Sequence, residues 1–119
     1  MMIYTGARVR EETTAWIEAQ LLTEAGAGFK PDTLTLLLYE YNRGTVVGAG
    51  RRDILSSCDA AGNISHELAP EDHAMIRARP EEGRVALLEW SWDGGTREGR
   101  REIHYTVENL RKVPATSPP

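Results

Sequence analysis

Three histidines and one cysteine are the residues of this chain best suited to acid–base, metal or nucleophilic chemistry. His66, His73 and His104 are scattered, and no two of them have the close spacing of a shared set of metal ligands. His73 follows Asp72 directly, but adjacent residues on a helical turn point apart. Cys58 lies among polar residues and would need a histidine beside it in space to act as a nucleophile. We therefore expect structural roles for all of these side chains.

Carboxylates occur as adjacent pairs at the ends of expected elements or in loops. The pairs are Glu11-Glu12, Glu71-Asp72 and Glu81-Glu82, and no motif places one of them as acid and base. The sequence also lacks a P-loop, a glycine-rich dinucleotide turn and a GxSxG elbow. It thus predicts a protein that is not an enzyme and that uses no metal and no cofactor.

Arginines form two groups, Arg51 with Arg52, and Arg97 with Arg100 and Arg101. We expect both groups to flank loops, as ordinary loop charge or as salt bridges to an acidic protein surface in an assembly. Nucleic-acid binding is disfavoured, because no aromatic platform is interleaved with the arginines and the formal net charge is −4.

Trp90 and Trp92 stand two residues apart and therefore share one face of an extended strand. Together with Trp16 they are expected to belong to the core. If they are exposed, they and the tyrosines Tyr39 and Tyr41 could form a platform for sugars. That alternative defines a second class of function, a host-surface or carbohydrate-binding module.

The segment from Arg84 to Val113 shows how the fold is built. Residues 85–90 and 102–107 alternate between two faces, which is the period of half-buried antiparallel strands. Asp93-Gly94-Gly95 lies between them, and glycine tolerates the positive φ that a tight turn needs. The segment therefore predicts a β-hairpin, with Ile103, Tyr105 and Val107 on one face of its second strand.

The other expected elements are mostly strands as well. In Ala7 to Leu22, local propensity leans towards helix, but the rest of the chain is β and needs a partner there, so we assign strand. The remaining assignments are a strand at Thr33 to Tyr41 with Leu34, Leu36 and Leu38 on one face, a short strand at Thr45 to Val47, a long connection at 48–62, a strand at Ile64 to Leu68, a helical turn at 69–72 and a loop at 80–83. Six or seven short strands separated by turns are typical of a sandwich or barrel.

Length and composition indicate one domain of 119 residues. We divide the chain into an N-terminal arm (1–6), a β-sandwich domain (7–113) and a proline-rich C-terminal tail (114–119). A single cysteine excludes an intramolecular disulfide. We find no signal peptide and no run of about 20 apolar residues that could span a bilayer. The expected site of synthesis is a cytoplasm, and no membrane contact is expected.

Three segments of this chain resemble small proteins of tailed bacteriophages. They are TLTLLLYEYNRGTVV, AGNISHELAPEDHAMI and the stretch from RVALLEW to LRKVP, within residues 30–114. The resemblance implies an all-β fold, an immunoglobulin-like antiparallel β-sandwich with one short helical turn. It also implies a virion component that binds capsid subunits as a decoration or cement protein, or a neck (head–tail connector) or tail component. No functional residue carries over, because the family has no catalytic motif.

The two ends of the chain are the expected means of attachment. Met1, Met2, Ile3 and Tyr4 are apolar but precede any core element, and Pro118 and Pro119 end the tail. Each aliphatic side chain buried on a neighbour would contribute roughly 1.5–3 kcal/mol. We therefore expect these residues to bind other virion proteins, such as capsid or neck subunits, with Arg51 and Arg52 as lesser contacts. A homo-oligomer is a further option, whereas nucleic acid and membrane are not expected partners.

Overall fold

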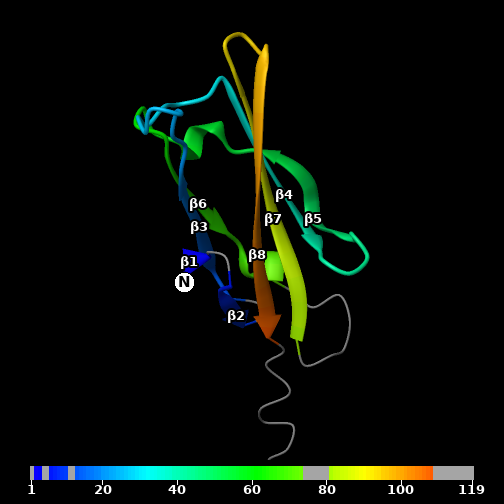
Figure 1. Cartoon of the computed structure of the whole chain (residues 1–119). Helices are drawn as coiled ribbons and strands as arrows, with labels where there is room; N and C mark the ends of the chain where they lie inside the picture. The colour runs from blue at the N-terminus through cyan, green and yellow to red at the C-terminus, as the bar shows by residue number, and fades with distance from the viewer. Residues whose placement is uncertain (1, 4–5, 11–12, 74–80, 109–119) are drawn as a thin grey trace, which may run out of the picture.

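The computed structural model describes residues 2–3, 6–10, 13–73 and 81–108, which form two β-sheets around one core (Figure 1). The larger sheet has the strand order β2-β8-β7-β4-β5, and the smaller sheet has the order β1-β3-β6. The strands are β1 (Met2–Ile3), β2 (Arg8–Arg10), β3 (Ala15–Gln20), β4 (Thr33–Glu40), β5 (Val46–Asp53), β6 (Asn63–Leu68), β7 (Glu81–Trp92) and β8 (Arg97–Glu108). Two 3-10 turns, η1 (Leu55–Ser57) and η2 (Pro70–His73), are also present.

The all-β prediction is confirmed, and η2 is the expected helical turn. Within the described ranges, no helix is long and apolar enough to cross a membrane.

The β7–β8 hairpin is the longest feature of the fold and extends beyond the smaller sheet (Figure 1). Its two strands pair without interruption from Glu81 opposite Glu108 to Trp92 opposite Arg97. The predicted turn is confirmed, and Asp93 adopts a left-handed φ of 55° ahead of two glycines. Asparagine and aspartate tolerate this region better than other side chains. The loop expected at 80–83 is wrong for Glu81–Gly83, because these residues continue the ladder with β8.

The core lies between the sheets, and the predicted faces supply it. Leu34, Leu36 and Leu38 of β4 are fully buried, as are Ala15 and Ile17 of β3. The strand assignment for this part of the Ala7–Leu22 segment is confirmed, because β3 pairs with β6 along its whole length. In β3, the free energy gained by burying alternate side chains outweighs the local preference of the segment for a helix.

Strand β5 is longer than the sequence predicted. The connection expected at 48–62 is wrong for residues 48–53, because the strand continues through Gly48 and Gly50. Each has a positive φ, and the pairing with β4 shifts register between Leu36 and Leu38. These are the marks of a β-bulge, where glycine bends a strand without ending it. Arg51 and Arg52 therefore lie on an edge strand rather than in a loop.

The N-terminal segment is part of the fold. Strand β1 pairs in parallel with β3, and Ile3 is fully buried in the core. The expectation that this arm has little of its own fold to bury against is wrong for Ile3. Met1 and Tyr4, and the tail with Pro118 and Pro119, lie outside the described residues.

Candidate functional site

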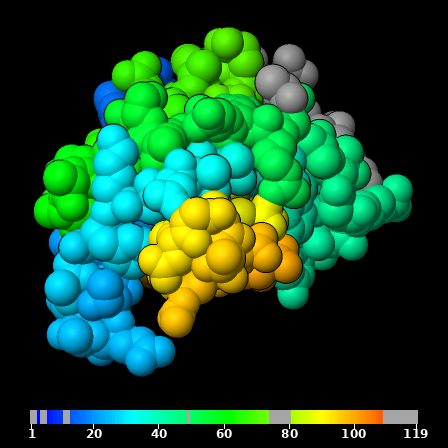
Figure 2. All heavy atoms as spheres, turned by 90° about the horizontal axis from the view of Figure 1, so that it is seen from above, coloured from blue at the N-terminus to red at the C-terminus, as the bar shows by residue number. Residues whose placement is uncertain are grey.

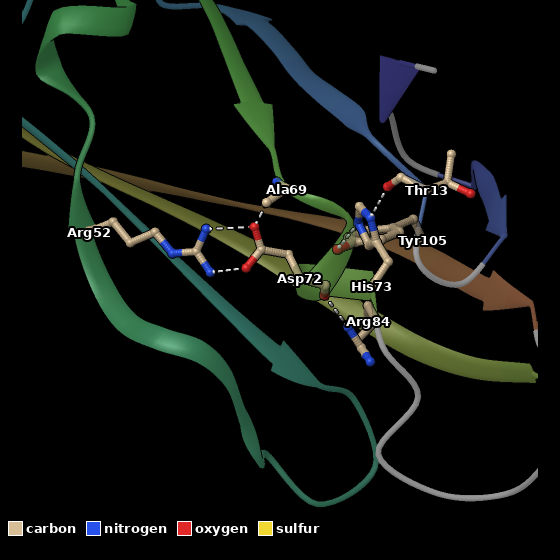
Figure 3. Close-up of polar contacts among 7 residues, drawn as sticks. All are labelled: Thr13, Arg52, Ala69, Asp72, His73, Arg84 and Tyr105. Atoms are coloured by element: carbon tan, nitrogen blue, oxygen red, sulfur yellow. Dashed lines mark hydrogen bonds and ion pairs between the residues drawn. The ribbon is translucent and has the colours of Figure 1, made fainter.

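A cluster of buried polar side chains lies where β5, η2, β7 and β8 approach one another (Figure 3). The turn η2 sends Asp72 towards Arg52 and His73 towards Tyr105, so the two neighbours point apart as expected. Arg84 of β7 reaches the backbone of the same turn. The cluster thus joins an edge strand, a turn and the central hairpin through side chains distant in sequence.

Arg52 and Asp72 form a bidentate ion pair. The guanidinium donates from Nη1 to Oδ2 at 3.0 Å and from Nη2 to Oδ1 at 2.6 Å, and the Ala69 N–H also donates to Oδ2. Burial alone would raise the pKa of Asp72, but the hydrogen bonds and charge of Arg52 lower it overall. Arg52 therefore holds β5 against η2. Its expected role as a lesser partner contact stays a prediction.

His73 is a neutral, structural histidine. Its Nδ1 lies 3.0 Å from the Thr13 carbonyl oxygen, which can only accept, so Nδ1 carries the proton. The Tyr105 hydroxyl lies 3.4 Å from Nε2 and can donate to it. Burial is the main cause that lowers the pKa of His73, and the nearby Arg84 lowers it further. Burial also raises the pKa of Tyr105.

Arg84 is the most unexpected member of the cluster, because it is a fully buried cation. Its Nε donates to Glu82 Oε1 at 2.6 Å, and its Nη1 donates to the Asp72 carbonyl oxygen at 2.8 Å. The sequence held a signal for this residue. Arg84 is in phase with Ala86 and Leu88 on the inward face of β7, where a charged side chain must find buried partners.

The tryptophans are less buried than predicted. Trp90 packs against the core but is only half-buried, Trp92 is also half-buried, and Trp16 is 36% exposed. A Cβ at Gly99 would lie 2.5 Å from the Trp90 indole, so the glycine lets the ring cover β8. The Phe29 ring lies 5.6 Å from Trp92 at 58°. The expectation that the tryptophans belong to the core is therefore met in part by Trp90, which packs against it, and is wrong for Trp16.

Phe29, Trp90 and Trp92 line a groove of about 710 Å³ between the loop of residues 21–32 and the tip of the β7–β8 hairpin. Figure 2 looks onto the tip, in yellow, with the loop in light blue beside it. Leu22, which is 52% exposed, adds an apolar edge. The volume is that of a typical ligand-binding cleft. The other lining residues are Thr23, Glu24, Ala25, Lys30, Asp32, Asp93 and Arg97.

The remaining candidates are engaged in separate contacts. Cys58 is buried and donates to the Asp59 carbonyl oxygen, and burial raises its pKa. His66 bonds Ser57 at 2.8 Å, and His104 bonds Glu102 at 3.1 Å. In the described ranges, no group of three or more histidine, cysteine or acidic residues could hold a metal ion.

The arginine groups form ion pairs within the chain. Arg51 and Arg100 both pair with Glu89, and Arg97 pairs with Asp93. The expectation that these arginines flank loops is wrong for both groups, because one lies on β5 and the other on β8. Exposed pairs of this kind contribute little to stability, on the order of 0–1 kcal/mol each.

The buried histidine makes the stability of the fold depend on pH. Because the pKa of His73 is lowered on folding, the unfolded chain binds a proton below about pH 6.5 that the folded chain does not. We expect the free energy of unfolding to fall between about pH 6.5 and 5, by at most about 1.4 kcal/mol per pH unit for this residue. Urea titrations at several pH values measure it.

The matched variant is His73→Gln, which should reduce that slope. A smaller slope should remain, because burial lowers the pKa of His66 as well. The carboxylate of Asp72 acts in a different window: its lowered pKa stabilises the fold above about pH 4, and this stabilisation is lost on further acidification. An unchanged slope between pH 6.5 and 5 in His73→Gln would contradict the assignment.

The polar cluster and the aromatic groove differ in how their side chains are engaged. Both imidazole nitrogens of His73 and both carboxylate oxygens of Asp72 are engaged within the protein. The aromatic groove, by contrast, presents half-buried rings at the surface. No protein-family model matches the chain, and a search of the curated proteins found no match either.

Proposed function

We propose that this protein is a non-enzymatic binding module, a structural component of a bacteriophage virion that attaches to capsid subunits as a decoration or cement protein. The observation that carries the proposal is the long β7–β8 hairpin, whose tip extends beyond the smaller sheet beside an aromatic groove. Such a tip can be inserted between neighbouring subunits. The all-β architecture of two sheets is also compatible with the immunoglobulin-like sandwich of the phage proteins that the sequence resembles.

The state of the reactive side chains supports a binding role. His73 is buried with both nitrogens engaged, and Cys58 is buried with a raised pKa, which disfavours the thiolate. Binding by a stable β-scaffold requires neither group. The Arg52–Asp72 ion pair and the hydrogen bond from Arg84 to the Asp72 carbonyl oxygen instead hold the turn η2 to β5 and β7.

Electron microscopy of particles made with and without this protein tests the proposal. We expect particles to carry additional density at the capsid surface that disappears when the protein is omitted. Density at the head–tail junction would instead favour the neck alternative, and density along the tail would favour the tail alternative. Particles without density in any of these positions would contradict a virion role.

The aromatic groove also favours a second candidate, a host-surface or carbohydrate-binding module. Trp90, Trp92 and Phe29 offer apolar rings next to carboxylates, a combination suited to sugars. The 58° tilt between Phe29 and Trp92 argues against a flat stacking platform. Tryptophan fluorescence in the presence of host surface glycans measures this binding, and Trp92→Ala should abolish a true response.

A further inference from the structure

The groove at the hairpin tip has the character of a site for an extended, proline-rich segment. Phe29 and Trp92 meet at 58° and Trp90 lies next to them, so the rings form walls rather than one flat surface. Proline rings pack between such aromatic walls, and a polyproline II segment enters them at low entropic cost because its backbone is already restricted.

The charges around the groove indicate a basic neighbour for those prolines. The carboxylates of Glu24, Asp32 and Asp93 line it, against the basic side chains of Lys30 and Arg97. Asp93 already pairs with Arg97, and Asp32 accepts a hydrogen bond from the hairpin turn. With three carboxylates against two basic side chains, the lining of the groove carries a formal charge of −1, which favours an approaching segment that carries positive charge.

This chain contains a segment with both properties. Pro114, Pro118 and Pro119 fall within six residues of the sequence PATSPP, and Arg111 and Lys112 precede them. We propose that the groove of one copy of this protein binds the 114–119 segment of a second copy, with Arg111 and Lys112 directed to the carboxylates.

The geometry of β8 favours a second copy over the same chain. Strand β8 runs from Arg97 at the groove to Glu108 at the opposite end of the molecule (Figure 1), about 36 Å at 3.3 Å per residue. The residues between Glu108 and Pro114 reach about 20 Å when fully extended. Even Pro119, 11 residues after Glu108, reaches only about 36–40 Å, so the 114–119 segment as a whole cannot lie in the groove of its own chain. The groove of a second copy is not subject to this limit.

Such a contact joins two different surfaces and is therefore heterologous. Repeated contacts of this kind close into a ring or continue as a filament, depending on the rotation between copies. The inference goes beyond the proposed function, because it concerns an association of the purified protein in solution. If it fails, the electron-microscopy test of a virion role is unaffected.

Two full-length variants test this association by complementation. The groove variant carries Trp92→Ala, and the tail variant carries Pro114→Ala, Pro118→Ala and Pro119→Ala. By sedimentation velocity, we expect the wild type to associate with increasing concentration and each variant alone to associate at least ten-fold more weakly. An equimolar mixture should form a 1:1 complex, because one variant supplies the tail and the other supplies the groove.

Two further variants keep the test decisive. Leu22→Glu replaces an exposed residue at the groove edge, and serves as the groove variant if Trp92→Ala does not fold. Tyr41→Ala removes an exposed aromatic ring outside the groove and should associate like the wild type. The inference is overturned if the wild type stays monomeric at all concentrations, if the variants associate as the wild type does, or if the mixture forms no complex. A glycan response that depends on Trp92 in a monomeric protein would likewise overturn it.

Discussion

Arg84→Ala is expected to lower the free energy of unfolding by about 3–5 kcal/mol, because it removes one partner of a buried ion pair. Glu82 would lose its 2.6 Å bond to Nε, and the Asp72 carbonyl would lose its 2.8 Å bond to Nη1. Both groups lie where water cannot replace the guanidinium, since Arg84 is fully buried and Glu82 is 2% exposed. Urea or thermal unfolding followed by circular dichroism measures the loss.

Two comparisons separate the ion pair from general damage to the hairpin. Arg101→Ala changes an exposed arginine on the neighbouring strand β8 and should shift the free energy by no more than about 0.5 kcal/mol. The double variant R84M/E82L replaces both charges by apolar side chains and should recover much of the loss. If Arg84→Ala is as stable as Arg101→Ala, the cluster does not stabilise the fold.

Ile3→Ala is expected to lower the free energy of unfolding by about 2–5 kcal/mol. Ile3 is fully buried between the sheets, and its strand pairs with β3 at Ile17. The substitution leaves a cavity in addition to the lost burial of the side chain. This outcome is the opposite of what a free N-terminal arm would show.

The matched control is Leu22→Ala, which truncates an aliphatic residue of similar size that is 52% exposed. It should change the stability by roughly 0.5 kcal/mol or less, as is usual for surface positions. Equal stabilities of Ile3→Ala and Leu22→Ala would show that β1 does not contribute to the core and would restore the interpretation of residues 1–6 as an arm.

The sequence by itself determined the elements whose signal is local. Alternation over Thr33–Glu40 and over 102–107 identifies two strands and their buried faces, because adjacent side chains of a strand point to opposite sides. Asp93-Gly94-Gly95 identifies the hairpin turn through the positive φ of its residues. Proline and acids in the first turn identify η2. In each case the residues that give the signal are also the residues that form the element.

The candidate sites were only partly accessible from the sequence. Trp90 and Trp92 were recognised as sharing a face, but their groove also needs Phe29, which is 61 positions before Trp90 in the chain. Asp72 and His73 are adjacent in the sequence, yet their partners Arg52, Arg84 and Tyr105 come from three different strands. A pattern of local spacing carries no information about such contacts.

Tertiary structure alone decided which side chains near the beginning of a strand are buried in the core. Ile3 is buried because β1 pairs with β3, and Arg84 is buried because η2 and Glu82 supply its partners. Gly48 and Gly50 lie within β5 at a shift of register, and pairing with β4 holds the strand on either side of them. The physical reason is the same in each case: burial and pairing depend on residues distant in sequence, and their free energy outweighs the weaker preferences of a short segment.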